Sequence, residues 1–135
     1  MKIISLLLIV CLTGIKVNAQ EKELMSDASI KTQVIWITEK KGIKEYKYKS
    51  QELRFDRKGN RVEEIYYSRR GKIIHHLAFD YEKGLKIREI KLDPKGFIIT
   101  RTDYRYVNKV PVELTVYNGK GEIVRTEMFI YEYQD

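Results

Sequence analysis

The side chains in this chain that could do chemistry are two adjacent histidines, a scatter of acids and ten tyrosines. His75 and His76 are neighbours, and neighbouring residues of a strand point to opposite faces, so they cannot easily hold one metal ion together. The chain has no third histidine, and its only cysteine is Cys11. We therefore expect no metal site, and we expect His75 to be a half-buried polar residue beside Ile73 and Leu77.

Paired carboxylates could hydrolyse a glycosidic bond if two of them faced one cleft and one had a raised pKa. Glu63 and Glu64 are neighbours and would point to opposite faces of a strand. Asp80, Asp93 and Asp103 are expected in turns or strands. The chain also contains no nucleophile elbow, phosphate loop or HExxH motif. We expect no catalytic residue, no cofactor and a protein that is not an enzyme.

Tyrosine is the one residue type that is clearly enriched. It has a high strand propensity and pairs well across strands, which is a structural explanation of the enrichment. A functional alternative is a tyrosine ladder on an open sheet face, where sugar rings or a protein partner could stack. The candidates for this ligand-binding face are Tyr66, Tyr104, Tyr106 and Tyr117. Trp36 is expected in the core, with an anchor on an edge strand as the alternative.

The N-terminal segment has the pattern of a secretory signal peptide, with Lys2, an apolar run over residues 3–15 and a cut expected after Ala19. The apolar run is shorter than the roughly 20 residues that a membrane anchor needs. A lipoprotein signal ending at Cys11 is a third alternative, and it is disfavoured because Val10 stands where a small residue is usual. We expect a secreted or periplasmic protein.

The sequence predicts three segments: a signal peptide over residues 1–19, a flexible lead-in or short helix over 20–30, and one sheet domain over 31–135. Cleavage would remove the only cysteine, so the mature chain would have no disulfide and its core would hold it together. No later stretch is apolar enough to span a membrane, so no stable membrane insertion is expected.

Cleavage would also remove Lys2 and Lys16 and no acid, so the formal net charge of +7 would become +5. This basic bias favours acidic surfaces such as anionic glycans, lipid headgroups or an acidic protein. The cations are interspersed with acids rather than massed in blocks, which is also typical of an ordinary solvated surface. Because exported proteins seldom meet nucleic acid, none is expected as a partner.

Apolar and polar residues alternate with period two in residues 72–81, 110–118 and 123–133. In the first of these stretches one face holds Ile73, His75, Leu77, Phe79 and Tyr81. One buried face and one solvated face are typical of antiparallel sheets.

A turn motif recurs along the chain at a steady spacing. A short polar residue stands three or four positions before each of five turn glycines: Asp56, Ser68, Asp80, Asp93 and Asn118. The steps between these residues are 12, 12, 13 and 25, and the last equals two units with a degraded one near residues 106–109. Asp or Asn caps the backbone of such a turn, and glycine takes its positive φ.

We therefore predict an all-β protein: an antiparallel β-meander of seven to nine strands with 12–13-residue hairpin repeats. It would form an open twisted sheet or a partly closed barrel. The alternation changes phase after Gly84, which predicts a β-bulge near Arg88 and Glu89. Pro111 lies inside an expected strand, which predicts an edge position or a strand start.

The stretches FDRKGNRVEEIYY, LDPKGFIITRTDYRY and YNGKGEIVRTEMFIYEY resemble the YD repeats of the RHS family of secreted β-sheet proteins. The matching positions are Phe55-Asp56 with Gly59, Phe79-Asp80 with Gly84, Leu92-Asp93 with Gly96, and Tyr117-Asn118 with Gly121. Three units replace the tyrosine and the fourth replaces the aspartate, so the match is short and divergent. The resemblance implies an exported sheet-forming module and carries over no catalytic residue.

The leading functional hypothesis is a non-enzymatic binding or structural module that binds a glycan or an envelope protein on a tyrosine-rich face. One alternative is a partner-capping protein, such as an immunity protein or an adaptor for an exported effector. Another is a barrel that binds a small lipophilic ligand. The sequence leaves the ligand and the oligomeric state open.

Overall fold

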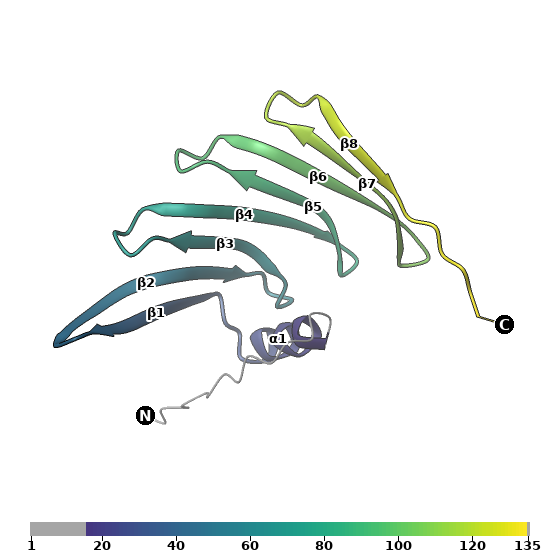
Figure 1. Cartoon of the computed structure of the whole chain (residues 1–135). Coiled ribbons are helices and arrows are strands. Elements are labelled where there is room, and N and C mark those ends of the chain that lie inside the picture. Colours follow the sequence, from purple (N-terminus) through teal and green to yellow (C-terminus); the bar gives the residue numbers. More distant parts are fainter. Residues whose placement is uncertain (1–15, 135) are drawn as a thin grey trace.

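A computed structural model describes residues 16–134 of the chain. These residues form one helix and one sheet of eight antiparallel strands, in which each strand pairs with the next along the chain (Figure 1). The elements are α1 (Lys16–Asp27), β1 (Thr32–Lys41), β2 (Lys44–Phe55), β3 (Arg61–Tyr67), β4 (Ile73–Glu82), β5 (Leu85–Leu92), β6 (Ile98–Val107), β7 (Val110–Asn118) and β8 (Ile123–Met128). The predicted meander is confirmed, and the sheet is open because β1 and β8 do not pair.

The pairing register separates the two faces of the sheet, because directly paired residues of antiparallel strands share a face. One row across the strands consists of Leu53, Glu64, Leu77, Lys91 and Thr100. Met25 of α1 packs against Leu53, so we call this side the helix face. The adjacent row consists of Glu52, Ile65, His76 and Leu92, and we call its side the outer face.

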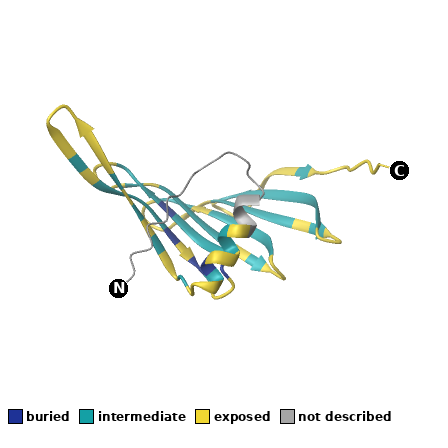
Figure 2. Cartoon of the chain, turned by 90° about the horizontal axis from the view of Figure 1, so that it is seen from below, coloured by how far each residue is buried: buried dark blue, intermediate teal, exposed yellow. Residues whose placement is uncertain are grey.

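The core of the described chain is small and lies under α1. Met25, Leu53 and Phe55 are buried together, with Ile30 and Ile35 partly buried against them. Figure 2 shows that most of the sheet is only half-buried. Because residues 16–134 provide no second layer over β5–β8, these strands depend within that range on contacts between neighbouring strands rather than on a deep core.

The segment expected as a flexible lead-in or short helix contains the last two thirds of α1, residues 20–27. Glu21, Lys22 and Met25 contact the sheet, and all three follow the expected cut after Ala19. The contacting part of the helix would therefore remain in the mature chain. Most of the expected signal peptide, residues 1–15, lies outside the described residues. The described part of the chain has no helix long and apolar enough to cross a membrane.

The repeated turn has the hydrogen bonding that its residue types require. The Asp56 carboxylate accepts the backbone N–H groups of Lys58 and Asn60, at 2.8 and 2.9 Å, and Gly59 takes a φ of +77°. The turns opened by Ser68, Asp93 and Asn118 repeat its backbone bonds. The short polar residue and the glycine thus account for this part of the repeat.

The prediction of a turn at Asp80 is wrong. Asp80 lies within β4, and the β4–β5 connection consists of Lys83 and Gly84 alone, both with positive φ (+51° and +81°). Two residues of positive φ form the tight hairpin turn whose twist matches that of the strands. In the sequence, Asp80 stands four positions before its glycine instead of three, and this longer spacing distinguishes the two-residue turn from the repeated turn. The degraded unit near 106–109 is a second turn of this kind, at Asn108 and Lys109.

A β-bulge follows each of the last six hairpin turns. The bulged residue has no direct partner and always lies three positions after the last turn residue. All six are β-branched: Val62, Ile74, Ile87, Ile99, Val112 and Val124. The bulge expected near Arg88 is thus at Ile87. For Pro111, the expected strand start is confirmed, because Pro111 lies at the start of β7 beside the bulge, and β7 is not an edge strand. Bulges increase local twist, so this series twists the sheet regularly.

The prediction that Trp36 lies in the core is also wrong. Trp36 lies on the edge strand β1 with 56% of its surface exposed, so it is not a core residue. The Lys47 ammonium lies 5.8 Å from the centroid of its ring. The apolar neighbours that predicted a core strand instead belong to a strand that is open along one edge.

Candidate functional site

The four tyrosines proposed as a ligand-binding face do not form one continuous row. Tyr66 lies two residues from Glu64 on β3, on the helix face. Tyr104 and Tyr106 follow Thr100 at even spacing on β6, so they share that face. Tyr117 pairs with Arg101 and lies on the outer face. The structure therefore brings together only Tyr104 and Tyr106.

Tyr66 is engaged within the sheet. Its ring meets the ring of His75 edge-on at 5.6 Å, and its hydroxyl donates to a carboxylate oxygen of Glu64 at 3.2 Å. Burial, followed by the Glu64 charge, raises the pKa of the Tyr66 hydroxyl. Both the ring and the hydroxyl therefore already have partners, and half-buried His75 is one of them.

Tyr104 and Tyr106 belong to a cluster around Lys86 on the helix face. The Lys86 ammonium lies 5.0 Å from the Tyr104 ring centroid, 5.2 Å from that of Phe79 and 2.9 Å from Glu89 Oε2. Burial lowers the pKa of Lys86, but the combined effects of Glu89 and, after it, Tyr104 outweigh burial, so the net shift is upward. The Tyr106 hydroxyl donates to the Lys86 carbonyl at 2.8 Å.

Tyr117 supports an ion pair on the outer face. The Arg101 guanidinium lies over its ring at 4.1 Å and contacts Asp103 at 3.3 Å. Asp103 also accepts from Arg88 at 2.9 Å, and Arg88 reaches Asp80 at 3.4 Å. A row of charges thus ties β4, β5 and β6 together across this face.

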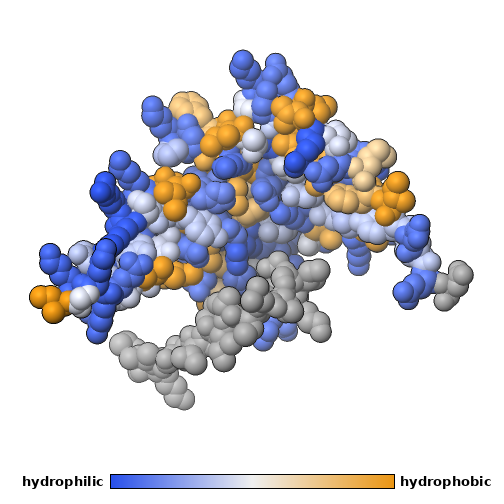
Figure 3. All heavy atoms as spheres, viewed as in Figure 1, coloured by the Kyte–Doolittle hydropathy of each residue, from blue (hydrophilic) through white to orange (hydrophobic). Residues whose placement is uncertain are grey.

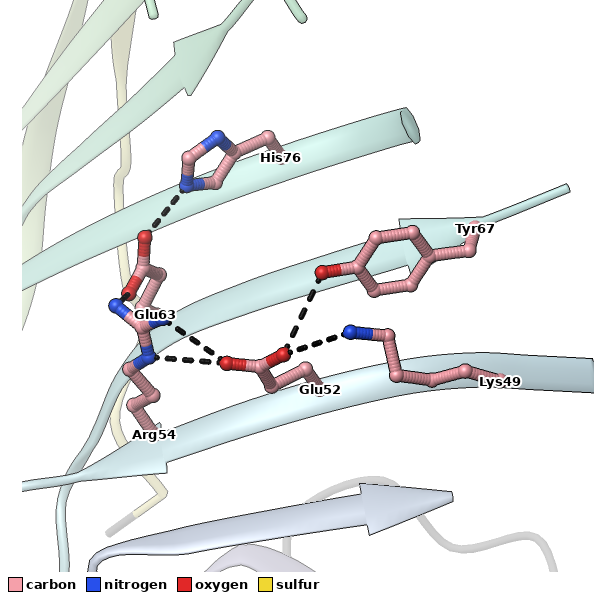
Figure 4. Close-up of polar contacts among 6 residues, drawn as sticks. All are labelled: Lys49, Glu52, Arg54, Glu63, Tyr67 and His76. Atoms are coloured by element: carbon pink, nitrogen blue, oxygen red, sulfur yellow. Dashed lines mark hydrogen bonds and ion pairs between the residues drawn. The ribbon is translucent and has the colours of Figure 1, made fainter. Parts of the chain in front are cut away.

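A second polar network on the outer face joins β2, β3 and β4 (Figure 4). Glu52 accepts from Lys49 at 3.1 Å, from Arg54 at 2.9 Å and from the Tyr67 hydroxyl at 3.4 Å. The hydrogen bonds from Lys49 and Arg54 outweigh the effect of burial and lower the pKa of Glu52.

Glu63 completes this network, because it contacts Arg54 at 2.7 Å and His76 Nε2 at 2.6 Å. Its neighbour Glu64 lies on the helix face with Arg61 at 2.6 Å. The carboxylates of the network are thus held by cations or by histidine, an arrangement that links strands. The sequence carried no signal for this network, because it depends on which residues lie opposite each other.

A hollow of about 310 Å³ lies between the β2–β3 and β4–β5 turns. It is lined by Asp56, Arg57, Lys58, Asn60, Tyr81, Lys83 and Gly84. Asp56 is committed to its own turn, and burial raises the pKa of Tyr81. Within residues 16–134, no group of three histidine, cysteine or acidic side chains is placed to hold a metal ion.

The part of the helix face beyond α1 is the most suitable surface for a ligand. Thr102 and Val116 are paired there, as are Tyr104 and Leu114, and we call these four residues the open strip. All four are half-buried, and the contacts of α1 with the sheet lie elsewhere, at Leu53, Phe55 and Arg61. In Figure 3 hydrophobic side chains are interspersed among hydrophilic ones on the side that faces the viewer.

Across residues 16–134, fold and surface together define a single-layer antiparallel β-sheet with one short helix. No family model matches the chain, and no curated protein matches it.

Proposed function

We propose that the protein is an exported, non-enzymatic binding module that contacts a protein partner through the open strip. The observation that carries the proposal is the half-exposed Tyr104–Leu114 pair on the helix face, away from the residues that α1 contacts. An aromatic ring next to aliphatic side chains is a composition typical of the centre of a protein interface. Contact with a partner would also give these strands a second layer, which residues 16–134 do not provide.

A glycan is the weaker of the two ligand classes. Sugars need stacking faces together with free hydrogen-bonding groups. The hydroxyls of Tyr66 and Tyr106 bond within the sheet, and Lys86 lies over the ring of Tyr104. An aliphatic and aromatic strip suits protein side chains better than sugar hydroxyls.

The resemblance to YD repeats supports a sheet-forming exported module, because its Asp-x-x-Gly positions form the repeated turns. A partner-capping protein remains the alternative, and the net basic charge favours an acidic partner. The barrel alternative has no support in residues 16–134, because the open sheet encloses no interior there.

The test is affinity capture from envelope and secretome extracts of the producing organism, read by mass spectrometry and by titration of the recovered partner. Tyr104→Ala is the test variant and Tyr117→Ala is the matched control, since the two tyrosines lie on opposite faces of adjacent strands. We expect one stoichiometric partner that Tyr104→Ala weakens about tenfold or more and Tyr117→Ala leaves unchanged.

Equal effects of the two variants would overturn the placement on the open strip. Binding of a sugar panel with no protein retained would return the proposal to the glycan class. Thermal unfolding of both variants shows whether a loss of binding reflects a loss of fold.

A further inference from the structure

The free edge at β8 is the most exposed part of the sheet. β8 pairs with β7 on one side only, and five of its six residues are exposed. Val124 and Met128 expose 58% and 73% of their surface. Between them, Arg125 and Glu127 form an exposed ion pair at 3.0 Å within the same strand. An open edge with apolar residues is a template for pairing with another strand.

The backbone of β8 has hydrogen-bonding groups that point away from β7. Just beyond the strand, the Phe129 N–H donates to the Val112 carbonyl at 3.0 Å, so residue 129 faces β7. Alternate residues of an antiparallel strand send their backbone groups to opposite sides. Residues 125 and 127 therefore also face β7, and Thr126 and Met128 present their N–H and C=O groups to the free edge.

We propose that the β8 edge binds a second copy of this chain, as an antiparallel two-fold dimer centred on Thr126. In this arrangement Thr126 pairs with Thr126 of the second copy. Arg125 lies opposite Glu127 of the second copy, and Glu127 lies opposite Arg125 of the second copy. Val124 then meets Met128 of the second copy at each end. Two eight-stranded sheets become one sheet of sixteen strands.

Register selects this centre over its neighbours. A two-fold axis perpendicular to a continuous sheet keeps each side chain on its face, and directly paired residues of antiparallel strands share a face. The residue at the centre of the contact must therefore pair with its own copy, because two successive residues of a strand lie on opposite faces. A centre on Arg125 places arginine on arginine, and a centre on Glu127 places glutamate on glutamate. Among residues 125–127, only a centre on Thr126 sets opposite charges against each other at both flanking pairs.

The other edge of the sheet is less suited to pairing. β1 ends in Lys40 and Lys41, and lysines on an edge strand oppose edge-to-edge association by charge and solvation. A β1–β8 contact between copies would also leave a free edge at each end, so it would build a filament instead of a closed dimer. The charge pattern of β8 instead gives an isologous, closed contact.

Sedimentation velocity and light scattering of the purified protein across a concentration series test the proposal. The variants are Arg125→Glu, which places glutamate opposite Glu127, and Glu127→Arg, which places arginine opposite Arg125. We expect a concentration-dependent dimer that each variant weakens about tenfold, because both symmetric charge pairs become repulsive. An equimolar mixture of the two variants should recover dimer, since every opposed pair in the mixed dimer is again Arg–Glu.

The matched control is Arg105→Glu, which breaks an exposed ion pair with Glu113 away from the edge and should not change the association. Thr126→Pro removes an N–H that faces solvent in the monomer, so it should abolish the dimer while far-UV circular dichroism stays unchanged. A monomer at all concentrations, a series of growing oligomers, or failure of the mixture to recover dimer would each overturn the proposal. Tyr104→Ala should leave association intact, which separates this test from that of the open strip.

Discussion

Gly59 in the β2–β3 turn lies directly against the backbone carbonyl of Lys22 in α1. A Cβ atom added at Gly59 would collide with that oxygen and would also lie 2.9 Å from the backbone nitrogen of Ser26. The glycine therefore serves two purposes, because it also holds a φ of +77°.

Gly59→Ala should destabilise the protein more than Gly96→Ala. Both glycines have positive φ, which costs roughly 1–2 kcal/mol for alanine, but the space around Gly96 is open. Overpacking against α1 should add about 1–3 kcal/mol at Gly59 only. Urea unfolding of the two variants measures the difference, and equal losses would mean that α1 does not dock on this turn in solution.

Lys109→Gly should stabilise the protein by about 0.5–1 kcal/mol. Lys109 has a φ of +67° after Asn108 at +50°, and Asn-Gly is the preferred pair for such a turn. Lys120→Gly is the control, since Lys120 follows Gly119 in a turn whose positive φ falls on Gly121. Thermal unfolding should show a gain for Lys109→Gly and no gain for Lys120→Gly. A gain in both variants would point to a general effect of removing lysine.

Glu52 should make stability depend on pH in the acid range. Its pKa in the folded chain lies below its ordinary value of 4.5 because Lys49 and Arg54 hold the carboxylate. The stabilisation is therefore complete above that ordinary value and is lost as the pH falls through the lowered pKa. Glu52→Gln should reduce the slope of unfolding free energy against pH below about 4.5 and leave the slope above pH 6 unchanged.

Leu53→Ala should cost about 2–5 kcal/mol, whereas Leu114→Ala should cost about 1 kcal/mol or less. Leu53 is 4% exposed under α1, and Leu114 is half-buried on the open strip. Denaturant unfolding of the two variants compares the same chemical change in two environments. If Leu114→Ala were as costly as Leu53→Ala, the open strip would already be covered in solution, for example by a partner or a second copy.

The fold was largely predictable because strand alternation and turn chemistry are local. Asp56 with Gly59 makes its own turn whatever lies around it, and the spacing of such turns sets the number of strands. Asp80 shows where local patterns fail. One extra residue before Gly84 moved the turn onto Lys83 and Gly84 and left the aspartate in a strand.

The candidate site was less predictable because it depends on register and on which face remains uncovered. Tyr104 and Tyr117 have similar sequence surroundings, yet they lie on opposite faces because their rows in the β6–β7 register are three residues apart, which is an odd number. Trp36 was expected in the core because its neighbours are apolar, but burial of a strand requires a layer above it. Neither the extent of α1 over the sheet nor the polar network around Glu52 leaves a trace in one sequence.

The rule that each of the last six hairpins carries its own turn and its own β-branched bulge makes the molecule modular. Every strand pairs only with the strands before and after it, so one hairpin can in principle be duplicated or removed without changing the geometry of the others. Such a sheet can change its length during evolution in steps of two strands, as a linear repeat protein does. The monomer should also unfold progressively from the β8 end, which lies beyond the contacts of α1, while the hairpins beneath α1 remain folded.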